Sequence, residues 1–305
     1  MTQPDRTTML SFVFLVLLGG SNAVFVRFSN LELPPFWGAT IRFATAALIF
    51  WIIVAVRRID IPRGRALIGV LLFGILANGL NYALLYYALV EITAGLTMVV
   101  TAFVPLLTFM FALAHGQESF RWRGIVGAFI ALGGIVLALG GSLGTGVPLA
   151  SLAALILSVI FLAEAPVVLK LFPPSHPMAT NAVAVTTGAI LVLIISLIVG
   201  EERALPTASE TWMSLIYLVL LGTVVLFYLY LRVLSSWTAS RTNYAFLLFP
   251  VITVTLAALL LGEQVTVALL VGGVIVLVGV WVGAFGGSPA KLEGAGTPSL
   301  EEAKP

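Results

Sequence analysis

The sequence predicts an all-α membrane protein in which ten transmembrane helices form two inverted five-helix repeats. Three observations lead to this fold class: the composition, the length of the apolar runs and an internal repeat. Among the 305 residues, 60% are hydrophobic and 9% are charged, whereas a soluble domain carries about 25% charged residues. We therefore expect most of the surface to face lipid, in a multi-pass protein of a bacterial inner membrane.

Ten apolar runs approach the ~20 residues that a helix needs to cross about 30 Å of hydrocarbon. The predicted spans are 9–29, 35–57, 66–90, 94–113, 122–140, 148–170, 177–199, 210–232, 239–261 and 264–285. The first run is not followed by a small-residue cleavage site, so we expect it to stay in the membrane. Residues 288–305 are polar and rich in Gly and Pro, which predicts a disordered cytoplasmic tail.

The basic residues predict the orientation of these spans. If the N-terminus lies in the cytoplasm, twelve of the fifteen Lys and Arg residues fall on the cytoplasmic side, two fall outside, and Arg42 lies within the second span. Basic residues close to spans are retained on the cytoplasmic side during insertion. Because the number of spans is even, both termini are expected in the cytoplasm.

An internal repeat relates the two halves of the chain. Pro105 and Pro250 are 145 residues apart. The same offset relates Glu118 to Glu263, Gly127 to Gly272, and Gly134 to Gly279. One pair could arise by chance, but a constant offset through all four pairs indicates duplication. The expected units are 1–146, with the first five spans, and 147–287, with the other five.

Because five is an odd number, the second unit enters the membrane with the opposite polarity. The units are then related by a pseudo-two-fold axis in the membrane plane. A cavity between such units can open to either side in turn, since each unit can adopt the conformation of the other. A duplication that merely makes a stable bundle is the less favoured alternative, because inverted repeats recur mainly in carriers.

Residues 86–141 and 231–287 resemble the EamA repeat of the drug/metabolite transporter superfamily. In both segments an aromatic residue and a leucine precede a Thr-Ala pair, a proline lies in mid-helix, a glutamate ends the helix and glycines space the next one. The resemblance implies ten helices in two inverted EamA halves, a central cavity and efflux of metabolites. The opening LLGGSNAVFVRFS and the span layout are similar to YddG-type amino-acid exporters, which implies an amino-acid substrate.

Polar residues inside spans are costly in hydrocarbon and commonly face a substrate path. In the third span Asn78, Tyr82 and Tyr86 are four residues apart and share one helix face, with Asn81 beside them. Their amides and hydroxyls could bind a zwitterion while the rings pack on an apolar side chain; helix packing is the alternative for each. The other residues expected at the cavity are Asn22, Arg42, Thr97, Thr101, Glu164, Tyr228, Asn243, Tyr244 and Phe249.

Arg42 and Glu164 are the ionisable residues that lie well within predicted spans. Arg42 could attract a carboxylate, and Glu164 could bind an amino group or a proton. Snorkelling of either side chain to the nearer interface is the alternative. Glu118 and Glu263 lie just past helix ends, where we expect capping or gate contacts.

Four residues are candidate hinges or gates. Pro105 and Pro250 each remove a backbone donor in mid-membrane and free a carbonyl for a ligand or for bending; a fixed kink is the alternative. Gly20 and Pro166 lie in the pseudo-equivalent first and sixth spans. A break there would turn backbone dipoles toward the cavity, although a small residue at Gly20 also suits close helix packing.

Together these features predict a secondary transporter that exports amino acids, aromatic and other neutral ones, and related small metabolites by alternating access. A multidrug or other metabolite exporter of the same fold is the alternative. The sequence has no cysteine, no G-x-x-x-x-G-K-[ST] loop and no H-E-x-x-H motif, so we expect no cofactor, no ATP hydrolysis and no metalloenzyme. An ion channel is disfavoured, because no ring of carboxylates is evident. The expected partners are a small solute and the lipid bilayer, not nucleic acid; the protein is expected to be a monomer, with a dimer left open.

Overall fold

The computed structural model describes residues 6–120, 122–143 and 148–285. Throughout these residues the chain forms helices and short connections, without a strand. The all-α class is therefore confirmed. The predicted tail and the predicted boundary between residues 146 and 147 lie outside the described residues.

The first unit crosses the membrane five times. The first two crossings are α1 (Arg6–Asn30) and α2 (Pro35–Val56). The third runs through α3 (Gly64–Phe73), the π-helical segment η1 (Gly74–Leu80) and α4 (Asn81–Glu91). The fourth is divided into α5 (Ala94–Thr101) and α6 (Val104–Ala114), and the fifth is α7 (Trp122–Leu143).

The second unit repeats this pattern. The sixth and seventh crossings are α8 (Leu149–Leu169) and α9 (Pro177–Val199). The eighth runs through α10 (Ser209–Val219), the π-helical η2 (Leu220–Val225) and α11 (Leu226–Ser236). The ninth consists of α12 (Ala239–Asn243), the 3-10 segment η3 (Tyr244–Leu247) and α13 (Phe249–Leu261), and the tenth is α14 (Val267–Phe285).

The lengths of these segments fit the predicted spans. Eight helices in the described residues are long and apolar enough to cross a membrane, and the shorter apolar helices α13 and α14 complete ten crossings. Apolar helices of this length satisfy all of their backbone hydrogen bonds internally, which lipid requires. The predicted ten-helix membrane fold is confirmed.

The two units share their departures from α-helical geometry. Adding the repeat offset of 145 to η1 (74–80) gives 219–225, which coincides with η2 (220–225). The fourth crossing breaks after Thr101 and resumes at Val104, whereas the ninth passes through η3 and resumes at Phe249. Val104 and Phe249 are also 145 residues apart. The backbone irregularities therefore follow the same repeat as the sequence.

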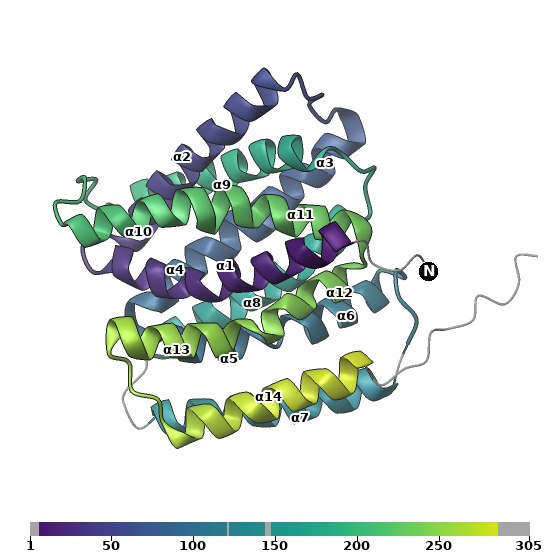
Figure 1. Ribbon diagram of the computed structural model, residues 1–305, viewed down its shortest axis with the longest axis vertical. Coiled ribbons are helices and arrows are strands. Elements are labelled where there is room, and N and C mark those ends of the chain that lie inside the picture. The colour runs from purple at the N-terminus through teal and green to yellow at the C-terminus, as the bar shows by residue number, and fades with distance from the viewer. Residues whose placement is uncertain (1–5, 121, 144–147, 286–305) are drawn as a thin grey trace, which may run out of the picture.

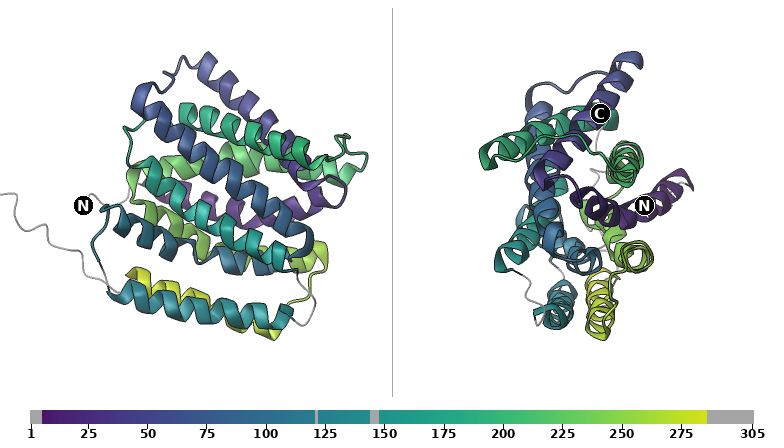
Figure 2. Two further views of the ribbon diagram at one scale, coloured as in Figure 1. Left: turned by 180° about the vertical axis from the view of Figure 1, so that it is seen from behind. Right: turned by 90° about the vertical axis from the view of Figure 1, so that its left-hand side faces the viewer.

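The two units interlock through repeat-related helix contacts. Helix α2 packs against α9 and α7 against α14, while α1 contacts α11 and α13 and its counterpart α8 contacts α4 and α6. Each contact that a helix of the first unit makes with the second unit is also made by its counterpart in the second unit with the first. A pseudo-two-fold axis requires this. Figure 1 shows α7 and α14 paired along one edge of the bundle, and the view from behind in Figure 2 shows the same pair.

The chain ends distinguish the two ends of the bundle. The first residues of α1 and the last residues of α14 lie at the same end (Figure 1), as an even number of crossings requires. We call this the terminal end, which includes the loops 57–63 and 170–176. The opposite end, which we call the distal end, includes the loops 31–34, 200–208 and 262–266.

Helices α7 and α14 meet with their backbones in contact because glycines face each other. A Cβ atom added to Gly134 would lie 2.6 Å from the carbonyl oxygen of Gly272 and 2.7 Å from the backbone nitrogen of Val276. A Cβ atom added to Gly279 would lie 2.5 Å from the backbone nitrogen of Ala131. Small residues that allow close approach are a main source of helix association in membranes.

Replacing Gly134 with alanine is expected to destabilise the protein, because the new methyl group would push α7 away from α14. Overpacking of this kind costs about 1–3 kcal/mol. The measurement is the midpoint of thermal unfolding in detergent. Gly133 is the matched control, since a Cβ atom there meets nothing within 4 Å. Gly133→Ala should keep or raise the midpoint, as alanine is the better helix former; equal midpoints for both variants would contradict the tight crossing.

Candidate functional site

A cavity of about 90 Å³ lies between the two units. It is lined by α1, the third crossing, α5, α8, α9, α11 and the ninth crossing. Its polar lining residues are Asn22, Asn78, Asn81, Tyr82, Thr101, Ser158, Asn181 and Tyr230, and its phenylalanines are Phe73, Phe227, Phe246 and Phe249. Among the described residues, no Asp, Glu, His, Lys or Arg lines this space.

Six of the predicted cavity residues line this space, and they come from four different crossings. They are Asn22, Asn78, Asn81, Tyr82, Thr101 and Phe249. The fold therefore brings the polar stripe of the third crossing together with side chains from α1, α5 and α13. The lining also includes a residue of the seventh crossing, Asn181, which the sequence did not suggest.

Three asparagines at the cavity have buried atoms that find no hydrogen-bond partner in the described part of the chain. These atoms are Nδ2 of Asn78, Nδ2 of Asn181 and Oδ1 of Asn22. The other end of the Asn22 amide is satisfied, since its Nδ2 donates to the carbonyl of Gly222 at 2.9 Å. A buried polar atom left unpaired costs about 1–3 kcal/mol. A polar solute or water in the cavity would supply the missing partners.

Arg42 lies beside the cavity, on its distal side, and is fully buried at 0% exposure. Its Nε donates to the hydroxyl of Thr223 at 2.7 Å, and its Nη2 donates to the carbonyl of Gly222 at 2.7 Å. Its Nη1 donates to the hydroxyl of Tyr86 at 3.2 Å. The acceptors Gly222 and Thr223 belong to η2, and π-helical turns of this kind recur at functional sites.

Aromatic rings form part of the cavity lining, in two groups. The ring of Tyr82 packs edge-on to Phe43, with the ring centres 4.9 Å apart, and lies 5.8 Å from the ring of Phe227. The rings of Phe246 and Phe249 are 4.7 Å apart. Edges and faces of such rings accept the apolar part of a ligand, so the cavity combines aromatic surface with amide groups.

A chain of neutral hydrogen bonds lies toward the terminal end of the bundle and begins at the cavity residue Tyr230. The hydroxyl of Tyr230 donates to Oδ1 of Asn243 at 2.9 Å, and Nδ2 of Asn243 donates to the hydroxyl of Thr108 at 2.8 Å. The Thr108 hydroxyl donates in turn to the carbonyl of Ala163 at 3.1 Å. This chain, the terminal tie, joins α11 and α12 to α6 and α8.

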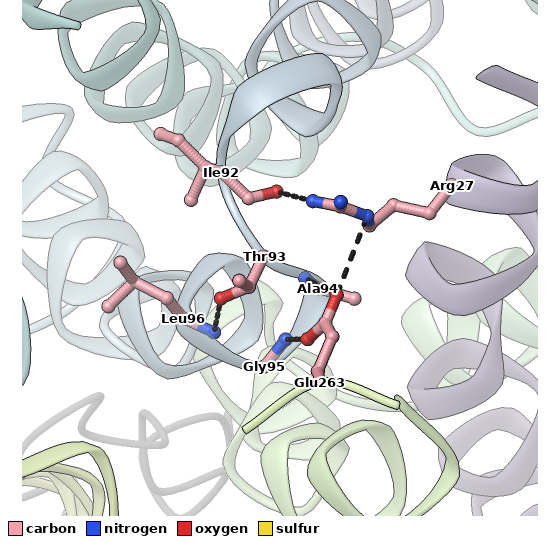
Figure 3. A network of polar contacts seen from close by, with 7 residues as sticks. All are labelled: Arg27, Ile92, Thr93, Ala94, Gly95, Leu96 and Glu263. Carbon is pink, nitrogen blue, oxygen red and sulfur yellow. Dashed lines mark hydrogen bonds and ion pairs between the residues drawn. The ribbon is translucent and has the colours of Figure 1, made fainter. Parts of the chain in front are cut away.

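At the distal end, a carboxylate of the second unit holds two helices of the first unit. Glu263 accepts hydrogen bonds from the backbone N–H groups of Ala94 and Gly95, at 2.9 and 3.2 Å, at the start of α5. It also pairs with Nε of Arg27, at the end of α1, at 3.5 Å, while Arg27 donates to the carbonyl of Ile92 at 2.7 Å (Figure 3). We call this network the distal latch, and the predicted capping role of Glu263 is confirmed.

The geometry of the latch follows from helix ends. The first N–H groups of a helix have no partner within it and carry partial positive charge, so a carboxylate is favourable there. Gly262 ends α13 with a φ of +65°, a left-handed conformation that suits glycine. The chain therefore turns sharply at this point and presents Glu263 to the start of α5.

The same end carries two further carboxylates that bind backbone N–H groups of the opposite unit. Glu201 accepts hydrogen bonds from the backbone N–H groups of Phe36 and Trp37 at the start of α2. Glu32 accepts hydrogen bonds from the hydroxyl and N–H of Thr207. These bonds, led by the one from the Thr207 hydroxyl, lower the pKa of Glu32 from 4.5 to about 2. Its contribution to stability is therefore present above about pH 4.5 and lost as the pH falls toward 2.

Seven predicted cavity residues do not line this space: Arg42, Tyr86, Thr97, Glu164, Tyr228, Asn243 and Tyr244. Arg42 and Tyr86 lie directly behind Tyr82, and Asn243 lies behind Tyr230 in the terminal tie. These three contact the lining without forming it.

The other four lie farther from the cavity. Thr97 is buried in α5, and its hydroxyl has no hydrogen-bond partner. Glu164 lies 3.4 Å from Nε2 of His115, toward the terminal end. Tyr228 accepts a hydrogen bond from Arg232, and Tyr244 lines a separate apolar groove beside α14.

The candidate hinges differ in their surroundings. Pro105 and Pro250 occupy the first turns of α6 and α13, so each begins a new helical segment after a break in its crossing. Pro166 lies inside α8 close to its terminal end. At Gly20 an added Cβ atom would lie 2.7 Å from Cβ of Ile252, and the Gly20 carbonyl accepts a hydrogen bond from Thr253. Gly20 therefore allows α1 to pack closely on α13.

Of two lining residues that were missed, the sequence carried a signal for one and not for the other. Asn181 is a lone amide in an apolar span and is 1% exposed. Tyr230 lies two residues beyond the predicted Tyr228, which is about 200° around the helix. Only the packing of α11 shows which of the two faces is turned toward the cavity.

Two comparisons with known proteins agree with this architecture. Residues 6–140 and 149–284 match the EamA-like transporter family. A solved crystal structure aligns with 92% of this chain and 96% of its own chain, with a TM-score of 0.68 and 19% sequence identity, and shows the same fold.

Three curated relatives carry transporter names. The uncharacterized inner membrane transporter YedA of Escherichia coli strain K12 is 28% identical over 83% of this chain and 82% of its own length. The uncharacterized transporter YoaV of Bacillus subtilis strain 168 is 24% identical over 93% and 99%. A probable amino-acid metabolite efflux pump of Escherichia coli strain K12 is 24% identical over 90% and 93%.

A ten-helix membrane fold built from two interlocked repeats around an internal cavity defines a multi-pass membrane protein. With both repeats matched, the chain belongs to the EamA-like transporter family.

Replacing Glu263 with glutamine is expected to loosen the distal end. The uncharged amide cannot form the ion pair with Arg27, and it has one acceptor oxygen where the carboxylate has two. The reporter is a cysteine at Val26, a cavity residue that is 1% exposed, in a protein with no other cysteine. Its labelling rate by a bulky maleimide should rise about three- to tenfold, which corresponds to the loss of about 1 kcal/mol.

The control for this experiment is Glu202→Gln. Glu202 is an exposed carboxylate in the distal loop 200–208, so its replacement removes the same charge at the same end without touching the latch. The labelling rate should then remain that of the parent. An unchanged rate in the Glu263 variant would show that the latch does not hold the distal end closed.

Proposed function

We propose that this EamA transporter exports amino acids, aromatic and other neutral ones, and related small metabolites by alternating access. The observation that carries the proposal is the meeting of unpaired amide atoms and aromatic rings in one cavity. Asn78 and Asn181 offer amides without partners, and Tyr82 and Phe227 offer ring surface. A small solute with a polar end and an apolar body would interact with both. The amino-acid metabolite efflux pump among the relatives supports the same substrate class.

The size of the cavity favours a small solute. Sites for drug-sized ligands measure about 300–1,000 Å³, whereas this cavity measures about 90 Å³. The alternative function, export of drugs or of other metabolites, is favoured by the largely apolar character of the lining, which includes four phenylalanines. The two functions differ in whether a compound without a charged end is carried.

The two closures suggest how access alternates. The distal latch and the terminal tie lie on opposite sides of the cavity, and both are made by residues of the two units together. In the proposed cycle one opens while the other stays closed. The pseudo-two-fold relation supports this exchange, since the same helix contacts occur in both units with their roles swapped.

We also propose that the terminal end faces the cytoplasm of a bacterial cell and the distal end the periplasm. The excess of Lys and Arg in the terminal loops supports this orientation, and one relative is named as an inner membrane transporter. The unit boundary at 146/147, the disordered tail and the monomeric state stay predictions.

Purified protein in liposomes loaded with unlabelled phenylalanine is expected to take up labelled phenylalanine by counterflow. Replacing both Asn78 and Asn181 with leucine should lower the initial rate about tenfold, because each amide supplies a hydrogen bond worth about 0.5–1.5 kcal/mol. Thr255→Val is the control, a polar-to-apolar change at an exposed position of α13, and should leave the rate unchanged. If the parent protein exchanges neither phenylalanine nor any other amino acid, amino-acid export is wrong.

Replacing Pro105 or Pro250 with alanine is expected to slow this exchange severalfold. Each proline begins a helical segment after a break in mid-membrane, and alanine would supply the missing N–H, extend the helix and stiffen that unit. Folding should survive, which size-exclusion chromatography checks.

The control is Pro177→Ala, at the start of α9. Proline at the first turn of a helix interrupts no hydrogen bond there, and Pro177 begins its crossing at the membrane boundary, where no break exists to repair. Exchange at the parent rate in both the Pro105 and the Pro250 variants would show that these prolines mark fixed kinks.

A further inference from the structure

Arg42 is a buried cation that pairs with no carboxylate among the residues that the structure describes. It lies in the first half of α2 at 0% exposure, and its three hydrogen bonds all go to neutral acceptors: the Thr223 hydroxyl, the Gly222 carbonyl and the Tyr86 hydroxyl. Neither of the two ion pairs found among the described residues involves Arg42. The neutral partners hold the guanidinium in place but do not cancel its charge.

An uncompensated charge inside a membrane protein is costly, and such residues commonly mark substrate pathways. Arginine keeps its charge under all physiological conditions. The cost of Arg42 would fall if an anion came close to it, because the attraction between opposite charges is strong where water is excluded. The position therefore favours a ligand that brings a negative charge.

The charge lies one side chain away from the cavity. The guanidinium carbon is 4.9 Å from the ring centre of Tyr82, which lines the cavity. Asn22, another lining residue, donates to the same Gly222 carbonyl as Arg42 does. The Tyr82 and Asn22 side of the cavity thus experiences the field of a fixed cation.

A cationic group of a ligand would find no acidic partner at the cavity. Among the described residues, no Asp or Glu side chain lines it, so an ammonium group would meet only amide oxygens, hydroxyls and rings. The electrostatic surroundings of the cavity are therefore one-sided. The field of Arg42 favours an anionic group at one side, and no acidic side chain is present to bind a cationic group.

We propose that Arg42 makes the cavity selective for carboxylates with an apolar body, and that the amino group of the solute is dispensable. This inference rests on the proposed function and narrows it. The carboxylate lies toward Tyr82 and Asn22, and the apolar body lies against Phe246 and Phe249. Arg42 acts through its field and through the residues that it orients, so it is a selectivity residue rather than part of the cavity wall.

The test uses five compounds that share one phenyl group. Phenylalanine, N-acetylphenylalanine and 3-phenylpropionate carry a carboxylate, whereas phenylalaninamide and phenethylamine do not. Each is measured as a competitor of labelled phenylalanine in counterflow and, separately, as a ligand that raises the thermal midpoint of the purified protein. The three carboxylates should compete at similar concentrations, and the other two should be at least about tenfold weaker.

The two readouts separate this inference from the proposed function. If the carboxylates raise the midpoint selectively but phenylalanine is not exchanged, the carboxylate site stands and amino-acid export falls. If phenylalanine is exchanged but its amide competes equally well, export stands and the role of Arg42 is wrong. If none of the carboxylates raises the midpoint or competes, the proposed site is overturned.

Arg42→Gln, Arg42→Lys and Arg203→Gln complete the test. Arg42→Gln should reduce the discrimination between acid and amide to about twofold, and Arg42→Lys should keep part of it because the charge remains. Arg203 lies exposed in the distal loop, so its replacement should leave the discrimination unchanged. If Arg42 had only a structural role, Arg42→Gln would weaken the interaction with phenylalanine and with phenylalaninamide equally, and the ratio between the two compounds would stay that of the parent. Should Arg42→Gln fail to fold, the competitor series on the parent protein still decides the question.

Discussion

The absence of water from the bilayer interior is the constraint on which this structure depends. A polar side chain there must find its partner within the chain. Ser21 and Thr40 donate to carbonyls one turn earlier on their own helices, and Asn22 reaches across to η2 in the other unit. Among the buried atoms that remain unpaired, those of Asn78 and Asn181 lie at one cavity. Unpaired atoms also occur elsewhere, at Ser29, Thr97 and Ser196, so it is the gathering of unpaired amides at one cavity that makes it the candidate place for a solute.

The two closures of the cavity use different chemistry. The distal end relies on carboxylates that cap helices of the opposite unit, as Glu263 does at α5 and Glu201 at α2. The terminal tie is made of hydroxyl and amide groups around Asn243. Charged contacts near the surface weaken as salt increases, whereas buried neutral hydrogen bonds do not. Ionic strength should therefore act on the two sides unequally.

The sequence predicts the fold better than the site. Span length and the constant offset of the repeat depend on local apolar runs and on paired landmarks such as Pro105 and Pro250, which need no tertiary information. The site depends on which face of each helix turns inward. Asn78 and Tyr82 were found because they form a stripe, but Asn181 stands alone in its span and gave no periodic signal. The π-helical turns also change the helix face on which every later residue of their crossing lies. The local sequence pattern at 74–80 and 220–225 does not predict these turns.

Those π-helical turns recur at corresponding places, in η1 and in η2. A π-turn closes its hydrogen bonds over five residues instead of four and is found frequently at functional sites. In η2 the widened turn supplies the Gly222 carbonyl, which accepts hydrogen bonds from both Asn22 and Arg42. One carbonyl of the second unit thereby couples a cavity residue of α1 to the buried cation of α2.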